Sequence, residues 1–204
     1  MPISHKGGPP EQKLPAYFYR LSQHAQRCYL ESDSITRFDL TPDKDATDAI
    51  ATLVLTLGDG NAAETAEATR MVTAEVCRLV KIPTLKVEVR DIRPKNTRGE
   101  LHGLFYPFDP RTRTPPHIVL WMRTAARRDV VKPRTFVRTL MHELVHYFDY
   151  AVLKLGDSFH TRGFFARESF LVRTLMQLEI KEKESAGPSL LREWLDRRAR
   201  DPDR

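Results

Sequence analysis

The segment from His142 to His146 combines residue types that bind a metal ion and move a proton, in the order His-Glu-Leu-Val-His. Two histidines four positions apart lie one turn apart on the same face of an α-helix, so both imidazoles can reach one Zn²⁺ at about 2.0–2.1 Å. Glu143 is rotated by about 100° from His142 and can instead reach water beside the ion. The segment therefore predicts a zinc site with Glu143 as its general base.

Two further residues are candidates for the third ligand that a catalytic zinc ion usually needs. His160 follows Gly156, where the chain must turn back toward the paired histidines. Glu168 falls on the apolar face of the next predicted helix, where a carboxylate is costly unless it is paired or bound to a metal. We predict His160 as the ligand and Glu168 as a buried partner of a ligand. A salt bridge of Glu168 with Arg138 is an alternative.

A further carboxylate, Asp149, lies three residues after His146 on the same side of the predicted helix. It can accept the spare N–H of a ligating imidazole and so select the tautomer that binds the metal. A solvent-exposed aspartate on the helix surface is the alternative.

Hydrophobic periodicity predicts the two helices that must carry these residues. The first covers residues 132–155, begins at Lys132-Pro133 and has Gly156 after it. One of its faces is apolar and should point to the core, and it consists of Val137, Leu140, Met141, Leu144, Phe148 and Leu155. The second helix covers about residues 163–182.

The rest of the chain predicts an α+β fold. We expect a helix over residues 15–32, another that starts at Thr41-Pro42 and ends at Gly58, and a third that Asn61 opens and that stops before Pro83. Alternation of apolar and charged residues then predicts strands at 85–89, 101–108 and 117–121. Their short connections favour an antiparallel meander on which the helices pack. Residues 93–99 are interpreted as a turn.

Three segments are expected along the chain. Residues 61–182 form the core with the H-E-x-x-H helix, and residues 1–60 form a helical extension packed on it. Residues 183–204 form a basic tail, partly helical or disordered.

The overall composition is that of a globular protein. The 204 residues are 41% hydrophobic and 29% charged, and contain no apolar run of the roughly 18 residues that a membrane helix needs. The first ten residues lack the apolar centre of a signal peptide, so we expect a cytoplasmic protein. The net charge of +6 is compatible with a nucleic-acid partner.

The motif as a whole resembles that of the SprT-like zinc metallopeptidases. In that family an H-E-x-x-H helix is followed by a short connection, a third histidine and an aromatic residue four positions further on. Here these positions are occupied by His142, Glu143, His146, His160 and Phe164. The resemblance covers about residues 61–182. It implies a zincin-like fold, Zn²⁺ as cofactor and hydrolysis of peptide bonds in a protein or peptide substrate.

The resemblance also implies a mechanism, in which Glu143 takes a proton from zinc-activated water and passes it to the leaving amine. A protein donor should stabilise the oxyanion, and Tyr106, His102 and Tyr150 are candidates. The strand at 101–108 or the strand at 117–121 can offer an edge to an extended peptide.

Other functions agree with the same residues. The chain can be a regulatory peptidase of the gluzincin type, with Glu168 as the third ligand, or a non-catalytic module in which zinc is structural. It can also be a nucleic-acid adaptor that uses the C-terminal arginines, which are Arg192, Arg197, Arg198 and Arg200. The oligomeric state is not indicated by the sequence.

Overall fold

The computed structural model describes residues 14–97 and 99–185 of the chain. Its elements, in chain order, are η1 (Phe18–Arg20), α1 (Gln23–Ser34), α2 (Lys44–Asp59), α3 (Ala62–Leu79), β1 (Lys86–Ile92), β2 (Lys95–Asn96), β3 (Gly99–Glu100), β4 (Gly103–Tyr106), β5 (His117–Arg123), α4 (Pro133–Ala151) and α5 (Arg162–Ser185). The predicted α+β class is confirmed. Residues 183–185 of the predicted basic tail belong to α5, and the rest of the tail, residues 186–204, lies outside the described residues.

Polar caps set where the first three helices begin. Ser22 caps α1, so the helix expected from residue 15 starts later, after the 3-10 turn η1. Asp43, not Thr41, caps α2 by accepting the backbone N–H of Ala46. The cap predicted at Asn61 is confirmed, because its side chain accepts two N–H groups at the start of α3.

Two helix ends differ from the prediction. Helix α2 runs through Gly58 and ends at Gly60, whose φ of 72° lies in the left-handed region that glycine adopts at low cost. Helix α4 ends at Ala151, four residues before the predicted end, and its last turn leads directly into the loop before α5.

The central sheet is mixed, so the prediction of an antiparallel meander was wrong. The strand order is β1-β5-β4, and β5 is parallel to β1 and antiparallel to β4. The reason is visible in β5, where five consecutive residues, Ile118–Met122, are buried. A continuously apolar strand belongs in the middle of a sheet. The predicted turn at 93–99 contains most of a two-stranded hairpin, β2 and β3.

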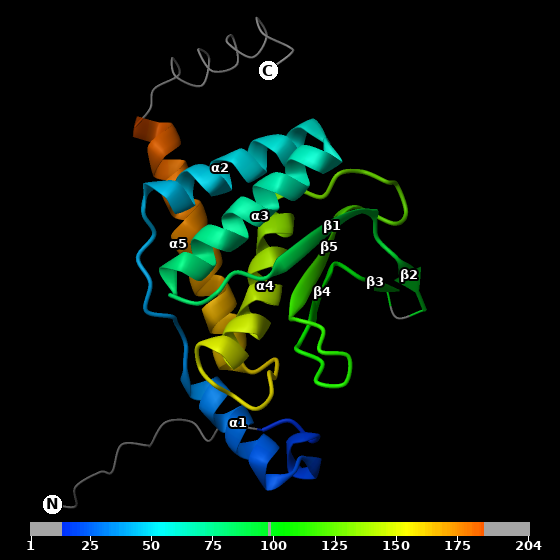
Figure 1. Ribbon diagram of the computed structural model, residues 1–204, viewed down its shortest axis with the longest axis vertical. Coiled ribbons are helices and arrows are strands. Elements are labelled where there is room, and N and C mark those ends of the chain that lie inside the picture. Colours follow the sequence, from blue (N-terminus) through cyan, green and yellow to red (C-terminus); the bar gives the residue numbers. More distant parts are fainter. Residues whose placement is uncertain (1–13, 98, 186–204) are drawn as a thin grey trace, which may run out of the picture.

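The sheet and the helices form layers with α4 in the middle. Helix α3 packs on β1, α4 packs on β4 and β5, and α2 and α5 pack against α3 and α4 on the side away from the sheet (Figure 1). Helix α4 is therefore covered on most sides, and its apolar face forms much of the core. The same helix carries the H-E-x-x-H segment, so contacts with the sheet and with the other helices fix where this segment lies.

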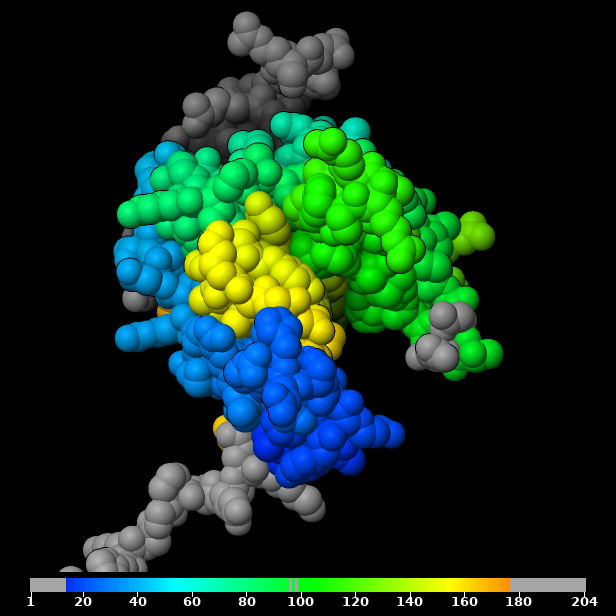
Figure 2. Space-filling view, turned by 60° about the horizontal axis from the view of Figure 1, so that its bottom comes forward, coloured from blue at the N-terminus to red at the C-terminus, as the bar shows by residue number. Residues whose placement is uncertain are grey.

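Helix α1 lies apart from these layers, at the ends of α4 and α5 where the loop between them passes (Figure 1). In the space-filling view this blue segment rests against the yellow segment that links the two helices (Figure 2). Of the expected N-terminal extension, α2 thus belongs to the layered core, and α1 contacts the start of α5.

Candidate metal centre

Three histidine nitrogens converge at the C-terminal half of α4. His142 and His146 project from successive turns of that helix, and His160 comes from the loop before α5. The Nε2 atom of His160 lies 3.0 Å from Nε2 of His142 and 3.1 Å from Nε2 of His146. Three ligands at tetrahedral angles around Zn²⁺ would be roughly 3.3 Å apart. The three residues therefore form a group that can hold a metal ion.

The outer nitrogens of the two helical histidines are both bonded to acceptors. Nδ1 of His142 lies 3.0 Å from the Glu168 carboxylate, and Nδ1 of His146 lies 2.8 Å from the Ser158 hydroxyl. That hydroxyl donates its hydrogen to Asp149 at 2.7 Å, so it accepts from His146. Both Nδ1 atoms therefore carry the hydrogen, and both Nε2 atoms offer a lone pair toward the centre.

Burial keeps two of the three imidazoles neutral. It lowers the pKa of His146 to about 3, an effect to which the nearby His142 and His160 add. Burial also lowers the pKa of His160, again helped by His142. Neutral imidazoles are the form that binds a metal, so the site is ready for a cation near neutral pH.

The two predicted carboxylate partners take different positions. Glu168 bonds His142 through one oxygen and Arg138 through the other, at 3.3 Å, so it makes both contacts that the sequence offered as alternatives. It lies on the far side of the His142 ring from the converging nitrogens and is not one of that group. Asp149 reaches His146 only through Ser158. No pattern in the sequence marked Ser158.

Glu143 lies beside the metal group and is almost fully buried, with 6% of its surface exposed. Burial raises its pKa to about 7, while His142 and the backbone N–H of Phe105 act in the opposite direction. A carboxyl group that titrates near 7 is suited to accept a proton and return it.

Strand β4 passes very close to this carboxylate because it begins with a glycine. A Cβ atom on Gly103 would lie 2.7 Å from Oε1 of Glu143 and 2.7 Å from the Thr139 methyl group. A side chain at that position would displace Glu143. Gly103 is thus part of the site, although no pattern in the sequence marks it.

A cavity of about 430 Å³ opens next to Glu143 and His142. Residues of β4, α4 and α5 line it, namely His102, Gly103, Arg138, Thr139, His142, Glu143, Phe165 and Glu168. His102 is the one candidate oxyanion donor among the lining residues. Tyr106 instead stacks on His117, with ring centroids 4.5 Å apart, and Tyr150 packs on Phe105 at 6.0 Å.

Comparison of the chain with protein-family models, curated proteins and solved structures finds no match in any of the three. None of the described helices combines the length and the apolar character that a membrane span requires.

Proposed function

We propose that the chain is a zinc-dependent metallopeptidase of the SprT-like kind. His142, His146 and His160 hold Zn²⁺, and Glu143 is the general base. The observation that carries this proposal is the convergence of three Nε2 atoms beside a buried carboxylate on the wall of an open cavity. A purely structural zinc site has four protein ligands and no need of a cavity or a base.

Each residue of the site has a step in the proposed reaction. Zn²⁺ held by the three imidazoles supplies a Lewis acid that acidifies water and polarises a carbonyl. Glu143 accepts the proton of the attacking water and delivers it to the nitrogen of the leaving amine, while the C–N bond breaks. His102, whose pKa is lowered by burial, is neutral and faces the cavity, where its N–H can stabilise the oxyanion.

Strand β4 is the edge at which an extended peptide would bind. It is one of the two outer strands of the three-stranded sheet, in which β5 is the central strand. The backbone N–H of Trp121 in β5 donates to the backbone carbonyl of His102. Even-numbered residues of β4 therefore form the backbone hydrogen bonds with β5, and the backbone N–H and C=O groups of Gly103 and Phe105 point outward. Glu143 accepts the N–H of Phe105. A peptide added beside Gly103 would therefore pass directly in front of the general base.

Elemental analysis and two variants test the proposal. We expect one zinc ion per chain, and we expect Glu143→Gln to keep that zinc while hydrolysis of an unfolded protein falls by about 10²-fold or more. His160→Ala should lose the zinc, whereas His117→Ala, a matched change outside the group, should keep it. Full hydrolysis by the glutamine variant would favour a non-catalytic module contaminated by another protease.

The gluzincin alternative makes a different prediction for the same assay. If Glu168 were the third ligand, Glu168→Gln would abolish zinc binding and His160→Ala would not. The position of Glu168 behind His142 favours His160. A nucleic-acid partner stays a prediction from the net charge of +6, and binding that weakens steeply with added salt would support it.

A further inference from the structure

The loop that carries His160 is attached to helix α1 on both sides of the histidine. The ring of Phe159, the residue before it, packs on Tyr29 with centroids 5.7 Å apart. The hydroxyl of Thr161, the residue after it, lies 3.2 Å from the hydroxyl of Ser32, and both residues are buried. The position of the third ligand therefore depends on α1.

The first turn of α5 continues this contact. The Asp33 carboxylate accepts the backbone N–H of Arg162 at 2.9 Å, and so places a negative charge at the positive end of α5. Gly163 packs against the carbonyl groups at the end of α1. A Cβ atom on it would clash with the carbonyl of Ser32 and would lie 2.6 Å from that of Asp33 and 2.7 Å from that of Ile35. Only glycine allows the two helices this close.

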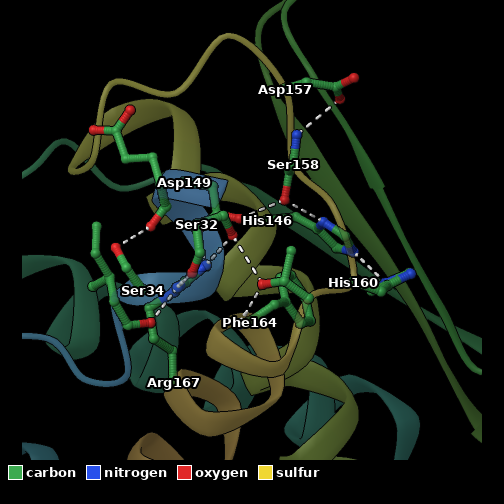
Figure 3. A network of polar contacts seen from close by, with 12 residues as sticks. Ser32, Ser34, His146, Asp149, Asp157, Ser158, His160, Phe164 and Arg167 are labelled. Carbon is green, nitrogen blue, oxygen red and sulfur yellow. Dashed lines mark hydrogen bonds and ion pairs between the residues drawn. The ribbon is translucent and has the colours of Figure 1, made fainter. Parts of the chain in front are cut away.

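A second connection reaches His146 through Arg167, which has no exposed surface. Its guanidinium donates to the carbonyls of Ser32 and Ile35 at 2.7 and 2.6 Å and to the Ser32 hydroxyl at 2.9 Å. It also donates to Asp149 at 2.8 Å. Asp149 accepts from Ser158, which accepts from His146 (Figure 3). An unbroken series of polar contacts thus links the end of α1 to a metal ligand.

We propose that α1 is a positioning element of the metal centre, so that its docking and metal binding stabilise one another. Three contacts carry the proposal: Ser32 with Thr161, Asp33 with Arg162, and Ser32 with Arg167. Without them, the loop ligand would lose orientation and the metal would have to order it on binding. The inference rests on the proposed metal site and does not depend on peptide hydrolysis.

Metal affinity of the full-length chain tests the proposal, with Co²⁺ and Zn²⁺ alone as probes. Gly163→Ala adds a methyl group that pushes α1 away without changing a ligand, and alanine is otherwise favourable within a helix. Partners of metal ligands typically contribute about 10–100-fold to affinity, so we expect the dissociation constant to rise by at least about tenfold. The matched control is Gly58→Ala in α2, where a Cβ meets nothing within 4 Å, and its affinity should be unchanged.

The cobalt spectrum separates positioning from general stability. In the wild type we expect the intense visible bands of four-coordinate Co²⁺, and in Gly163→Ala weaker bands, because His160 no longer holds its place. Ser32→Ala is the milder variant, which decides the question if Gly163→Ala does not fold. Wild-type affinity and spectrum in each of these variants that folds would overturn the proposal. Absence of any Co²⁺ or Zn²⁺ binding by the wild type would instead overturn the metal site itself.

Hydrogen exchange provides the reciprocal test. Coupling is symmetric, so a metal ion that is held more tightly when α1 is docked must also hold α1 more tightly. We expect the amides of residues 23–34 to exchange more slowly when Zn²⁺ is added to the wild type, and this slowing to be reduced in Ser32→Ala. Exchange in α1 that is unaffected by Zn²⁺, in a protein shown to bind it, would contradict the coupling.

Discussion

Replacing Arg167 with methionine should be among the most destabilising single changes in the described part of the chain. Arg167 and Asp149 form an ion pair at 2.8 Å in which both side chains are 0% exposed. Methionine fills similar space, but it leaves the Asp149 carboxylate buried with the hydroxyl of Ser158 still donating to it, and it removes the donors to the carbonyl groups of Ser32 and Ile35. Breaking a buried pair in this way costs about 3–5 kcal/mol.

A second arginine on the same helix supplies the control. Arg162 also pairs with a buried aspartate, at 3.1 Å, but its own side chain is 73% exposed. Exposed pairs contribute about 0–1 kcal/mol, so Arg162→Met should cost far less than Arg167→Met. Urea denaturation of both variants measures the two free energies of unfolding, and an unchanged slope shows that they are comparable.

The pH dependence of the Arg167→Met effect gives a further check. Burial raises the pKa of Asp149, and Arg167 opposes that rise. Without the arginine the folded carboxyl stays protonated to higher pH than the unfolded one, so folding binds a proton. The loss of unfolding free energy relative to the wild type is then smaller at low pH, and it grows as pH rises through the range in which the Asp149 carboxyl ionises. A deficit below about 1 kcal/mol near neutral pH, or one that grows on acidification, would refute this reasoning.

Further predictions concern the site itself. Gly103→Ala should lower kcat/KM for peptide hydrolysis by about 10-fold or more with zinc content unchanged, because its Cβ would displace the Glu143 carboxylate; an unaltered rate would show that the approach of β4 is not needed. Because the base must be ionised, kcat/KM should fall as pH drops below the Glu143 pKa of about 7, and bound Zn²⁺ should move this limb to lower pH; a pH-rate profile checks the sign, and activity that rises on acidification would contradict it. Glu168→Gln should weaken zinc binding by about 10–100-fold without abolishing it, as measured by competition with a chelator. Complete loss of zinc in that variant would support Glu168 as a ligand instead.

Several parts of the fold could be predicted because their signals are local. Asn61 marks the start of α3 because its side chain accepts hydrogen bonds from the backbone N–H groups two and three residues further on. Apolar and charged residues alternate around Val87, and this alternation indicates the strand β1. Strand pairing was different, because the choice between parallel and antiparallel partners depends on which strand is buried on both faces. The apolar run Ile118–Met122 indicates such a central strand, but the short connections between the strands favoured an antiparallel meander, which is wrong.

The candidate site likewise has a part that the sequence predicts locally and a part that depends on tertiary contacts. The helical repeat alone determines that His142 and His146 share a face and that Glu143 lies beside them, since residues within one helix have fixed relative directions. The tertiary structure decides what surrounds them. Ser158 enters between His146 and Asp149, Arg167 joins them to α1, and Gly103 brings β4 onto Glu143.

The sequence by itself thus determined the local chemistry of this protein, namely two imidazoles and a carboxylate on one helix and a short set of possible third ligands. The sequence already favoured His160 among these, but only the tertiary structure brings its Nε2 atom within 3.1 Å of those of His142 and His146 and attaches its loop to α1. The physical reason is sequence distance. Ser32 and Thr161 are 129 positions apart, and contacts of that range depend on the packing of whole helices, which no local pattern of residues records.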